Sequence, residues 1–597
     1  MNARAQFARL LRGVLFSAAV FFSVTTASAQ VPLQPSQLPS RTIFYVAWHG
    51  SPSSAERKTN ALLALWDDPD FAPARSAMLQ RFLSNNDRAE KSETALTREE
   101  LVEYSALLDN GFVFGYLPDP HKAHAAGADK TAAPKWNGTF FLYDRTGKEA
   151  LLSKAVVRFR SSEKDPPTIS TVQIAGLPAL KIERTTGTLY WIEHGKYAAS
   201  SSERSVLEDL LTRIESKSAS DSLDQSTAYQ EAKPGLAGGI AEFFVRIPDS
   251  KELMEGMAAT GTNTPYPMQS VYQSLKLDSV HSISGRVALD GAKTRTTGSI
   301  LGVVGPGTLF DLWDEGTIAP ASLAFAGPDT VAYSETRLNL PGIYGLANQV
   351  IQMYLPPQPG KPNLVEAMAQ QKLGVPLQAA VDSFSGEVAR IQNDRGLDPD
   401  KQLYVVGIQK QQTALDVIHH VYENQISGEH SEGNLTFMKI TPVTPAPSKP
   451  DVAASKPSTS SYHLVFSPDA ILISEHSETL RSLLANRAAA PGSTGLSSNP
   501  AFQSIRARYP GKIIGLSFYD FQKVDWAAAK TQWLAQAAKA SDRAAGNNSS
   551  AQSPKRAMST DAWLQEIDPK VLSRHLHTSA SASWKDAKGL HLDGWID

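Results

Sequence analysis

The sequence predicts an α+β protein made of two tandem copies of a largely antiparallel sheet, with helices packed on one face of each sheet. Three observations lead to this prediction. Short strand-forming runs are separated by turn residues, amphipathic helical segments lie between them, and the same outline occurs twice along the chain. The outline is clearest in two segments, LYWIEHGKYAASSSERSVLEDLL at residues 189–211 and YHLVFSPDAILISEHSETLRSLL at residues 462–484.

The N-terminus has the pattern of an export signal. Arg4, Arg9 and Arg12 precede the apolar run VLFSAAVFFSV, and the small residues ASA precede Gln30. An apolar run of about 11 residues is shorter than the roughly 20 that cross a bilayer. The sequence therefore predicts a signal peptide over residues 1–29, a periplasmic or secreted protein, and no stable membrane insertion after cleavage. An uncleaved N-terminal anchor is the alternative.

The composition is that of a globular protein without disulfides. The 597-residue chain has 42% hydrophobic residues and no cysteine, so its stability has to come from buried apolar surface. Its 58 Lys and Arg side chains nearly balance 60 Asp and Glu side chains, which leaves no excess of positive charge for binding phosphates. Nucleic acid is therefore not expected as a partner.

The repeat extends beyond the two quoted segments. Without a gap, Tyr229 falls on Phe502 in the same alignment. Farther along, His281 falls on His577 once an insertion of the second copy that contains the tract KASDRAAGNNSSAQSPKRAMST is skipped. An alignment that keeps apolar positions in step over this length indicates a duplication. Two unrelated α+β domains with similar patterns are the alternative.

The repeat defines the predicted domain limits. The first copy is expected at residues 38–305 and the second at residues 320–597. Residues 306–319 form the predicted linker, because glycines and prolines are frequent around them. Two tracts of the second copy are rich in Pro, Ser, Ala and Asn, and mobile insertions are predicted there, at about residues 442–461 and 539–560.

Each copy begins with a strand followed by helices. In the first copy TIFYVAW predicts the first strand, and ERKTNALLALW and APARSAMLQRFL predict two amphipathic helices, because their apolar residues recur at intervals of three and four. The helix REELVEYSALL then leads through the turn residues DNG into the next strand.

A meander and a further helix follow. STVQIAGLPALKIERTTGTLYWIEHGKYAAS has strand runs broken by AGLP, TTG and HGK, and strands joined by such short turns pair antiparallel. Ser200 and Glu203 have the spacing of a capping box for the next helix, and Ser474 with Glu475 marks the corresponding helix start in the second copy. Both helices are expected to bury a leucine pair, Leu210 with Leu211 and Leu483 with Leu484.

Searches for catalytic motifs favour a noncatalytic protein. The G-x-S-x-G pentad of α/β-type serine hydrolases does not occur. Ser161 and Lys164 match S-x-x-K, a nucleophile and base spacing, but the companion S-D-N and K-T-G motifs are missing and the segment is predicted as a loop. The run GVVGPG lacks the Lys-Ser/Thr that follows a phosphate-binding loop. No catalytic or cofactor-binding residue is therefore predicted.

The histidines suggest a metal site only weakly. His575 and His577 would share one face of a strand, with His591, Asp586 and Asp593 nearby. The first copy keeps His281 but has other residue types at three aligned positions, Ser279, Arg295 and Thr297. A site present in one copy alone has little support, because histidines on a wet strand face need no metal. No metal ligand and no cofactor are predicted.

Other polar and aromatic clusters have structural explanations. His419 and His420 are adjacent on a predicted helix, where their side chains diverge by about 100°. WDDPDF lacks the spacing of a calcium loop, so its carboxylates, Asp67, Asp68 and Asp70, are expected to end one helix and cap the next. The tryptophans in apolar patterns are expected in the core instead of at a sugar site: Trp48, Trp66, Trp191, Trp526 and Trp584.

Four stretches carry a resemblance to a known class of proteins: LPSRTIFYVAW, NALLALWDDPDFAPAR, LQAAVDSFSGEVARI and LYWIEHGKYAASSSERSVLEDLL. Together they resemble exported bacterial domain-of-unknown-function proteins built of long, divergent tandem α+β repeats. The first copy departs from the pattern, since Asn110 and Gly111 lead to Phe112 where the second copy has Gly386 and Glu387. The resemblance implies export and architecture, and it carries over no catalytic residue.

These observations favour a noncatalytic exported protein that binds a macromolecule or an envelope component. Its partner is expected to be a protein or an envelope component of unknown identity. The alternative is a divergent hydrolase that acts on an envelope polymer, and a structural spacer is a third possibility. A pocket with a carboxylate pair or an activated serine would favour the enzyme, whereas an apolar surface patch would favour binding.

Overall fold

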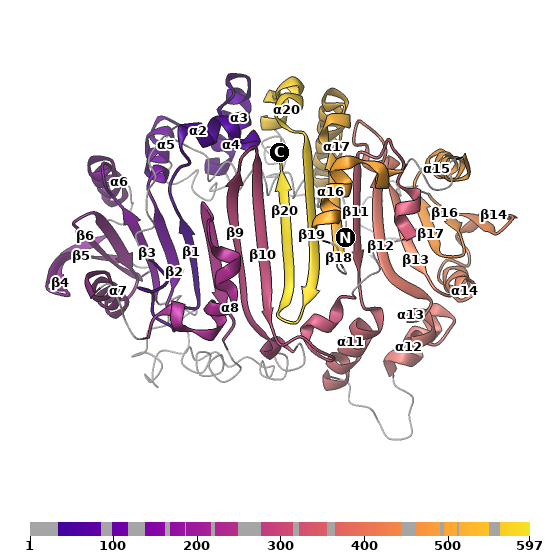
Figure 1. The fold of residues 1–597 in the computed structure, drawn as a ribbon, viewed down its shortest axis with the longest axis horizontal. Coiled ribbons are helices and arrows are strands. Elements are labelled where there is room, and N and C mark those ends of the chain that lie inside the picture. Colours follow the sequence, from indigo (N-terminus) through magenta and orange to yellow (C-terminus); the bar gives the residue numbers. More distant parts are fainter. Residues whose placement is uncertain are drawn as a thin grey trace. The chain divides into compact units, whose positions relative to one another are not determined.

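A computed structural model describes the fold in Figure 1. The described residues are 34–84, 98–117, 138–161, 167–184, 187–216, 221–248, 276–314, 321–354, 364–442, 461–489, 495–509, 513–547 and 562–597. The chain divides into two compact units, Met1–Val303 and Val304–Asp597. Each unit is described by itself. The predicted limits of the copies and linker remain predictions, because compactness alone does not define a repeat.

The first unit contains an antiparallel sheet. Its strands are β1 (Phe44–Trp48), β2 (Phe112–Tyr116), β3 (Thr139–Asp144), β4 (Thr168–Ile174), β5 (Leu177–Arg184), β6 (Gly187–His194), β7 (Tyr197–Ser201), β8 (Ala241–Arg246), β9 (Val280–Asp290) and β10 (Lys293–Gly302). Neighbouring strands follow the order β4, β5, β6, β7, β3, β2, β1, β8, β9, β10, and each of these pairs is antiparallel.

The helices of the first unit connect these strands. They are α2 (Ser54–Thr59), α3 (Ala61–Asp67), α4 (Ala72–Ser84), α5 (Arg98–Ser105), α6 (Glu149–Ser161), α7 (Arg204–Ser216) and α8 (Thr227–Leu236). Short 3-10 turns are η1 (Pro69–Phe71), η3 (Ala106–Asp109), η4 (Leu223–Gln225) and η5 (Leu277–Ser279).

The second unit also contains an antiparallel sheet. Its strands are β11 (Ala332–Arg337), β12 (Phe384–Gln392), β13 (Leu403–Ile408), β14 (Ile426–Glu432), β15 (Leu435–Ile440), β16 (Tyr462–Phe466), β17 (Ala470–Ser474), β18 (Ile513–Asp520), β19 (Thr578–Asp586) and β20 (Gly589–Ile596). Neighbouring strands follow the order β14, β15, β16, β17, β13, β12, β11, β18, β19, β20. Counted from the first strand of each unit, the two orders are the same.

The helices of the second unit are α11 (Leu340–Tyr354), α12 (Leu364–Leu373), α13 (Leu377–Val381), α14 (Gln411–Val421), α15 (Ser477–Ala489), α16 (Pro500–Arg508), α17 (Trp526–Asn547), α19 (Ala562–Glu566) and α20 (Pro569–His575). Its 3-10 turns are η6 (Leu309–Leu312), η7 (Ala321–Phe325), η8 (Pro399–Lys401), η9 (Leu496–Ser498) and η10 (Phe521–Lys523). The α+β class and the antiparallel pairing predicted from the sequence are confirmed.

Helices pack on both faces of the first sheet, so the prediction of one covered face is incomplete. Leu142 and Leu210 belong to the core between the strands and helices α7 and α8, and Figure 1 shows α8 beside β9. The next residue along β3, Tyr143, points to the opposite face and packs there with Leu152 of α6. In the second unit, Val405 likewise packs under α15 and α16, and Ile408 packs on α14.

Two predicted helix boundaries are corrected by capping side chains. The segment predicted as one helix, ERKTNALLALW, is two helices, because Asn60 ends α2 in an extended conformation and its side chain accepts the Leu63 N–H at the start of α3. The predicted contact between Ser200 and Glu203 is replaced by one from the next residue, Ser201, at the end of β7. Ser201 Oγ accepts the Glu203 N–H at 3.1 Å, and Ser474 Oγ accepts the His476 N–H at 3.2 Å.

The leucine pairs and part of the predicted insertions can also be located. Leu210, Leu211 and Leu483 are buried, and Leu484 packs partly buried against the core of the second unit. The tract predicted as mobile from residue 539 begins inside α17, which continues to Asn547, because its alanines favour a helix. Residues 443–460 and 548–561 lie outside the described residues.

Candidate binding surface on the first unit

The two faces of the first sheet differ because successive side chains of a strand point to opposite sides. On β1, Tyr45 and Ala47 point into the core beneath α8 and are each 1% exposed. Phe44 and Val46 therefore point to the opposite face, where they are partly exposed. The described helices cover this second face only near Trp48 and Tyr143, at one end of the strands.

Cross-strand register collects apolar side chains on the rest of this face, up to Phe141, which borders the covered end by packing against the cluster of Tyr143 and Leu152. Val46 lies directly opposite Phe114 of β2 and Phe243 of β8, and Phe114 lies opposite Phe141 of β3. Residues directly opposite each other in a sheet share a face. The next row holds Phe44 and its neighbours, so the whole set, here called the apolar face, is Phe44, Val46, Phe114, Tyr116, Phe141, Phe243, Val245, Ile283 and Ile300.

The apolar face is uncharged and open to solvent. Phe114 is 40% exposed and Phe243 is 39% exposed, and the other members are partly exposed. The rings of Phe44 and Phe114 meet edge to face, with centroids 5.5 Å apart. The ring of Phe243 lies over Gly285 of β9, where an added Cβ would come within 2.6 Å of a ring carbon. Contiguous apolar side chains at this exposure are typical of a binding surface.

The corresponding face of the second unit is polar. Ser334 of β11 lies opposite Arg390 of β12 and Ser517 of β18, and Ser517 lies opposite Ser581 of β19. Arg390 donates a hydrogen bond to the hydroxyl of Tyr519 at 3.0 Å. The two sheets therefore share an order of strands but present different chemistry at the same place.

A tyrosine and a carboxylate are buried together under α8 in the first unit. Tyr45 donates from its hydroxyl to Glu242 Oε1 at 3.0 Å, and the Tyr229 hydroxyl lies 3.5 Å away. His49 Nε2 approaches the other Glu242 oxygen at 3.8 Å. Burial, with the Glu242 charge, raises the pKa of Tyr45, and burial raises the pKa of Tyr229 to about 12. Both phenols therefore stay protonated.

The second unit has a similar pair built from a different strand. Tyr333 donates to Glu335 Oε2 at 2.6 Å, so its oxygen accepts the 2.8 Å hydrogen bond from the Ser322 hydroxyl. Burial raises the pKa of Glu335 to about 7, and Glu387 adds to the shift. Ser322 and Tyr333 are at most 1% exposed, so a substrate has no access to them, and these contacts are structural.

The sequence does not reveal these pairs, because their carboxylates lie at positions that do not align. In the first unit the carboxylate is Glu242 of β8, opposite Ala47 of β1. In the second unit it is Glu335 of β11, opposite Leu516 of β18. The two cross-strand pairs occupy the same place in the two sheets, but the carboxylate comes from β8 in the first unit and from β11 in the second. An alignment of the sequence does not reveal this correspondence.

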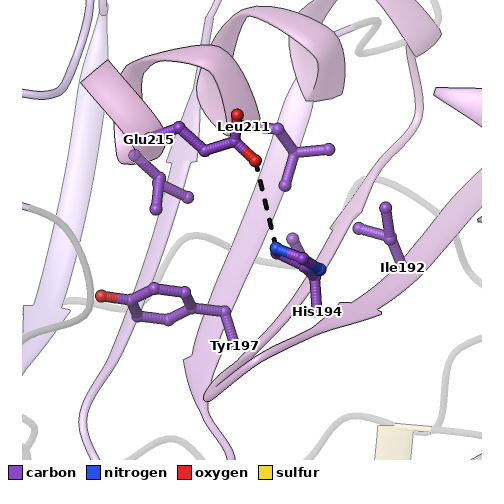
Figure 2. A pocket seen from close by; sticks show the side chains of 7 residues that line it. Ile192, His194, Tyr197, Leu211 and Glu215 are labelled. Carbon is purple, nitrogen blue, oxygen red and sulfur yellow. Dashed lines mark ion pairs between the residues drawn. The ribbon is translucent and has the colours of Figure 1, made fainter. Parts of the chain in front are cut away.

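A small pocket lies between strands β6 and β7 and helix α7 (Figure 2). Its walls are mainly apolar, with Ile192, Leu211 and Tyr197 among them. Figure 2 shows His194 and Glu215 pointing toward one another across it, with a nitrogen-to-oxygen distance of 4.0 Å. Both side chains are more than half exposed, so this pair does not form a desolvated reactive site.

The histidines and acids considered as metal ligands do not converge. His575 ends α20 and His577 precedes β19, so the prediction that both lie on one face of a strand is wrong. His591 contacts Asp586 at 3.0 Å, whereas Asp593 is held by the Tyr509 hydroxyl and by Arg508. Among the residues that the structure describes, no group of three or more His, Asp or Glu could hold a metal ion.

Other candidate residues have local partners. Ser161 ends α6, and Lys164 lies outside the described residues. His419 contacts Glu429 at 3.0 Å, and His420 contacts the Gln371 carbonyl at 3.0 Å, so the two rings diverge.

The acidic run between helices has the expected capping role. Asp68 caps η1 by accepting the Asp70 N–H, and Asp67 pairs with Arg57.

The tryptophans are divided between the core and partly exposed positions. Trp48, Trp66 and Trp526 are at most 3% exposed, which confirms core packing. Trp191 is partly exposed and packs at the edge of the α6 cluster. Trp584 is also partly exposed and stacks between Tyr509 and His591, with ring centroids 5.1 and 5.3 Å away.

Comparison of the chain with protein-family models, curated proteins and solved structures finds no match. Within the described ranges, none of the helices combines the length and the apolar character needed to cross a bilayer.

Proposed function

We propose that this chain is a noncatalytic exported protein that binds a macromolecule or another envelope component through the apolar face of its first unit. The observation that carries the proposal is the contiguous set of uncharged aromatic and aliphatic side chains, with Phe114 and Phe243 about two-fifths exposed. Removing such a surface from water is the main driving force of most protein associations. The predicted signal peptide and the resemblance to exported repeat proteins support the export part of this proposal, and N-terminal sequencing of the exported chain tests it.

A charge placed on the apolar face should abolish binding. The variant carrying Phe114→Glu and Phe243→Glu is expected to retain at least about tenfold less material from an envelope extract, isolated envelope polymer or phospholipid vesicles, because binding would bury two charges. Val421→Glu is the matched control, since Val421 is 40% exposed on α14 of the second unit. Circular dichroism checks that all variants fold.

Two results would contradict the proposal. Equal retention by the double variant and by the Val421→Glu control would remove the apolar face as the binding surface. Release of soluble fragments from envelope polymer, undiminished in the double variant, would instead support the hydrolase alternative.

We further propose that the two units are copies of one ancestral repeat. Their common strand order supports this proposal. So does the register, because residues aligned in the sequence occupy corresponding pairs: Trp191 opposite Ser200 in the first unit and Leu464 opposite Ile473 in the second. Ser201 and Ser474, which are also aligned, make the same hydrogen bond at a helix start. Experimental structures of the separate units that fail to superimpose on these pairs would contradict common descent.

A further inference from the structure

The first sheet ends in an exposed edge strand that carries no charge. Strand β4 has the sequence TISTVQI and is exposed along most of its length, including Ile169 at 38%. Its only neighbour among the described strands is β5. Edge strands of soluble proteins are usually protected by charge, proline or a bulge, because their free main-chain groups can pair with another strand. Strand β4 has none of these within its span.

The edge strand at the same place in the second unit is protected. Strand β14, ISGEHSE, carries Glu429, His430 and Glu432, and its pairing with β15 is interrupted by a register shift between Ser427 and His430. Gly428 has a φ of +63° at this irregularity. The contrast shows that an exposed edge in this chain can carry the usual protection, and that β4 lacks it.

The hairpin geometry identifies which main-chain groups of β4 point outward. Ala175 and Gly176 form a two-residue turn with φ of +51° and +75°, so the adjacent pair, Ile174 with Leu177, is a hydrogen-bonded pair. Alternation along the uninterrupted ladder then directs the N–H and C=O groups of Ile169, Thr171 and Gln173 away from β5.

Two contacts agree with this assignment. Gln173 lies opposite Pro178, which has no N–H to donate. The carbonyl of Gln173 instead accepts a hydrogen bond from Arg204 Nη2 of α7 at 2.9 Å. This contact lies at one end of the β4 edge and leaves the centre of the strand uncovered. It is also exposed to solvent, since the Arg204 side chain is 53% exposed.

We propose that β4 pairs with β4 of a second copy of this chain, antiparallel and with a two-fold axis at Thr171. In this register the outward residues face each other: Thr171 opposite Thr171, and Ile169 opposite Gln173. The segment suits self-pairing because no charges meet and threonine pairs with threonine across the axis. In each copy Arg204 already donates to the Gln173 carbonyl, so it has to move before that carbonyl can accept the Ile169 N–H of the other copy. This association is independent of the proposed function of the apolar face.

A proline at the centre of the strand tests the pairing. Because the Thr171 N–H points away from β5, Thr171→Pro removes an outward donor without removing a hydrogen bond of the hairpin. The full chain should show a monomer–dimer equilibrium in sedimentation equilibrium, and Thr171→Pro should raise its dissociation constant at least about tenfold. Thr171→Lys should do the same through like-charge repulsion across the axis. Ser431→Lys on the exposed β14 edge is the matched control and should leave the dissociation constant unchanged.

Cross-linking tests the position of the axis. The chain has no cysteine, so Thr171→Cys introduces a single thiol. The two thiol-bearing residues of the dimer would have Cα atoms about 5.5 Å apart, within reach of a short bismaleimide. Thr171→Cys should yield a covalent dimer, whereas Ser431→Cys should form no covalent dimer, because its thiols lie away from the proposed contact.

Several outcomes would overturn the proposal. A chain that sediments as a monomer at every accessible concentration, with no binding at β4, would contradict the proposal. A dimer unaffected by both Thr171→Pro and Thr171→Lys, or one that Thr171→Cys fails to cross-link, would place the contact elsewhere. A chain that stays monomeric but captures an added extended peptide on β4 would show that the edge serves a different partner.

Discussion

Glu335 lies in the interior of the second unit, where its surroundings change its acid–base behaviour. The residue is 8% exposed, and its carboxyl group accepts a hydrogen bond from the hydroxyl of Tyr333. Burial raises its pKa from an ordinary value of 4.5 to about 7, although Tyr333, Arg337 and Arg506 act in the opposite direction. The folded protein therefore holds a proton on Glu335 more tightly than the unfolded chain does.

This difference predicts a loss of stability as the pH rises. The favourable contribution of the protonated Glu335 is complete below about pH 4.5 and is lost as the pH rises through about 7. A raised pKa of this size corresponds to about 3 kcal/mol in the free energy of unfolding. The glutamine of Glu335→Gln cannot ionise, so this variant should lack the decline. Its free energy of unfolding, relative to that of the parent protein, should therefore increase as the pH rises across that range. Urea unfolding at several pH values measures it, and parallel profiles would contradict the prediction.

Strand β12 shows how an element depends on one backbone position. Gly386 has a φ of +78°, and an added Cβ would lie 2.0 Å from the Leu338 carbonyl oxygen. The ladder between β12 and β13 shifts register between Phe384 and Val388, around this glycine. The strand can bend there because glycine accepts the left-handed conformation and leaves room for the neighbouring chain.

Alanine at this position should be far more costly than alanine in an open turn. Gly386→Ala is expected to lower the free energy of unfolding by about 3 kcal/mol or more, since the strained φ and the close carbonyl act together. Gly176→Ala is the matched comparison, because Gly176 has a similar φ of +75° but open space around it, and about 1 kcal/mol is expected. If both variants lose the same free energy of unfolding in urea, the close approach of an added Cβ to the Leu338 carbonyl does not contribute to the loss, and the prediction is wrong.

At the scale of the whole molecule, each unit has its own core. Leu210 packs among the strands and helices of the first unit, and Leu483 packs in the second. They are 1% and 4% exposed, respectively. A unit with a separate core is expected to unfold as a separate cooperative body.

Core truncations should therefore act on one unit at a time. Leu210→Ala and Leu483→Ala are each expected to cost about 2–5 kcal/mol. Calorimetry of the full chain should show two unfolding transitions. Leu210→Ala should lower the midpoint temperature of one, and Leu483→Ala should lower that of the other. Expression of residues 34–303 and 304–597 as separate chains would assign the transitions. A single transition that both variants lower equally would show that the units unfold together.

The sequence by itself determined the local elements of this protein. Alternating apolar residues and turns such as Ala175-Gly176 predict the hairpins, and apolar spacing predicts helices such as α7, because these signals depend on residues close together in the chain. Where two neighbouring side chains could accept the same N–H, local spacing is insufficient, and Ser201 instead of Ser200 accepts the Glu203 N–H just before α7 begins.

Only the tertiary structure decided which residues meet across strands. Val46 joins Phe114 and Phe243 because β1 lies between β2 and β8, which are distant from it in sequence. The same lateral pairing puts Glu242 and Glu335 at one place in the two sheets from different strands. The apolar face could not be predicted because strand order and register depend on contacts between remote segments, which a local pattern does not contain.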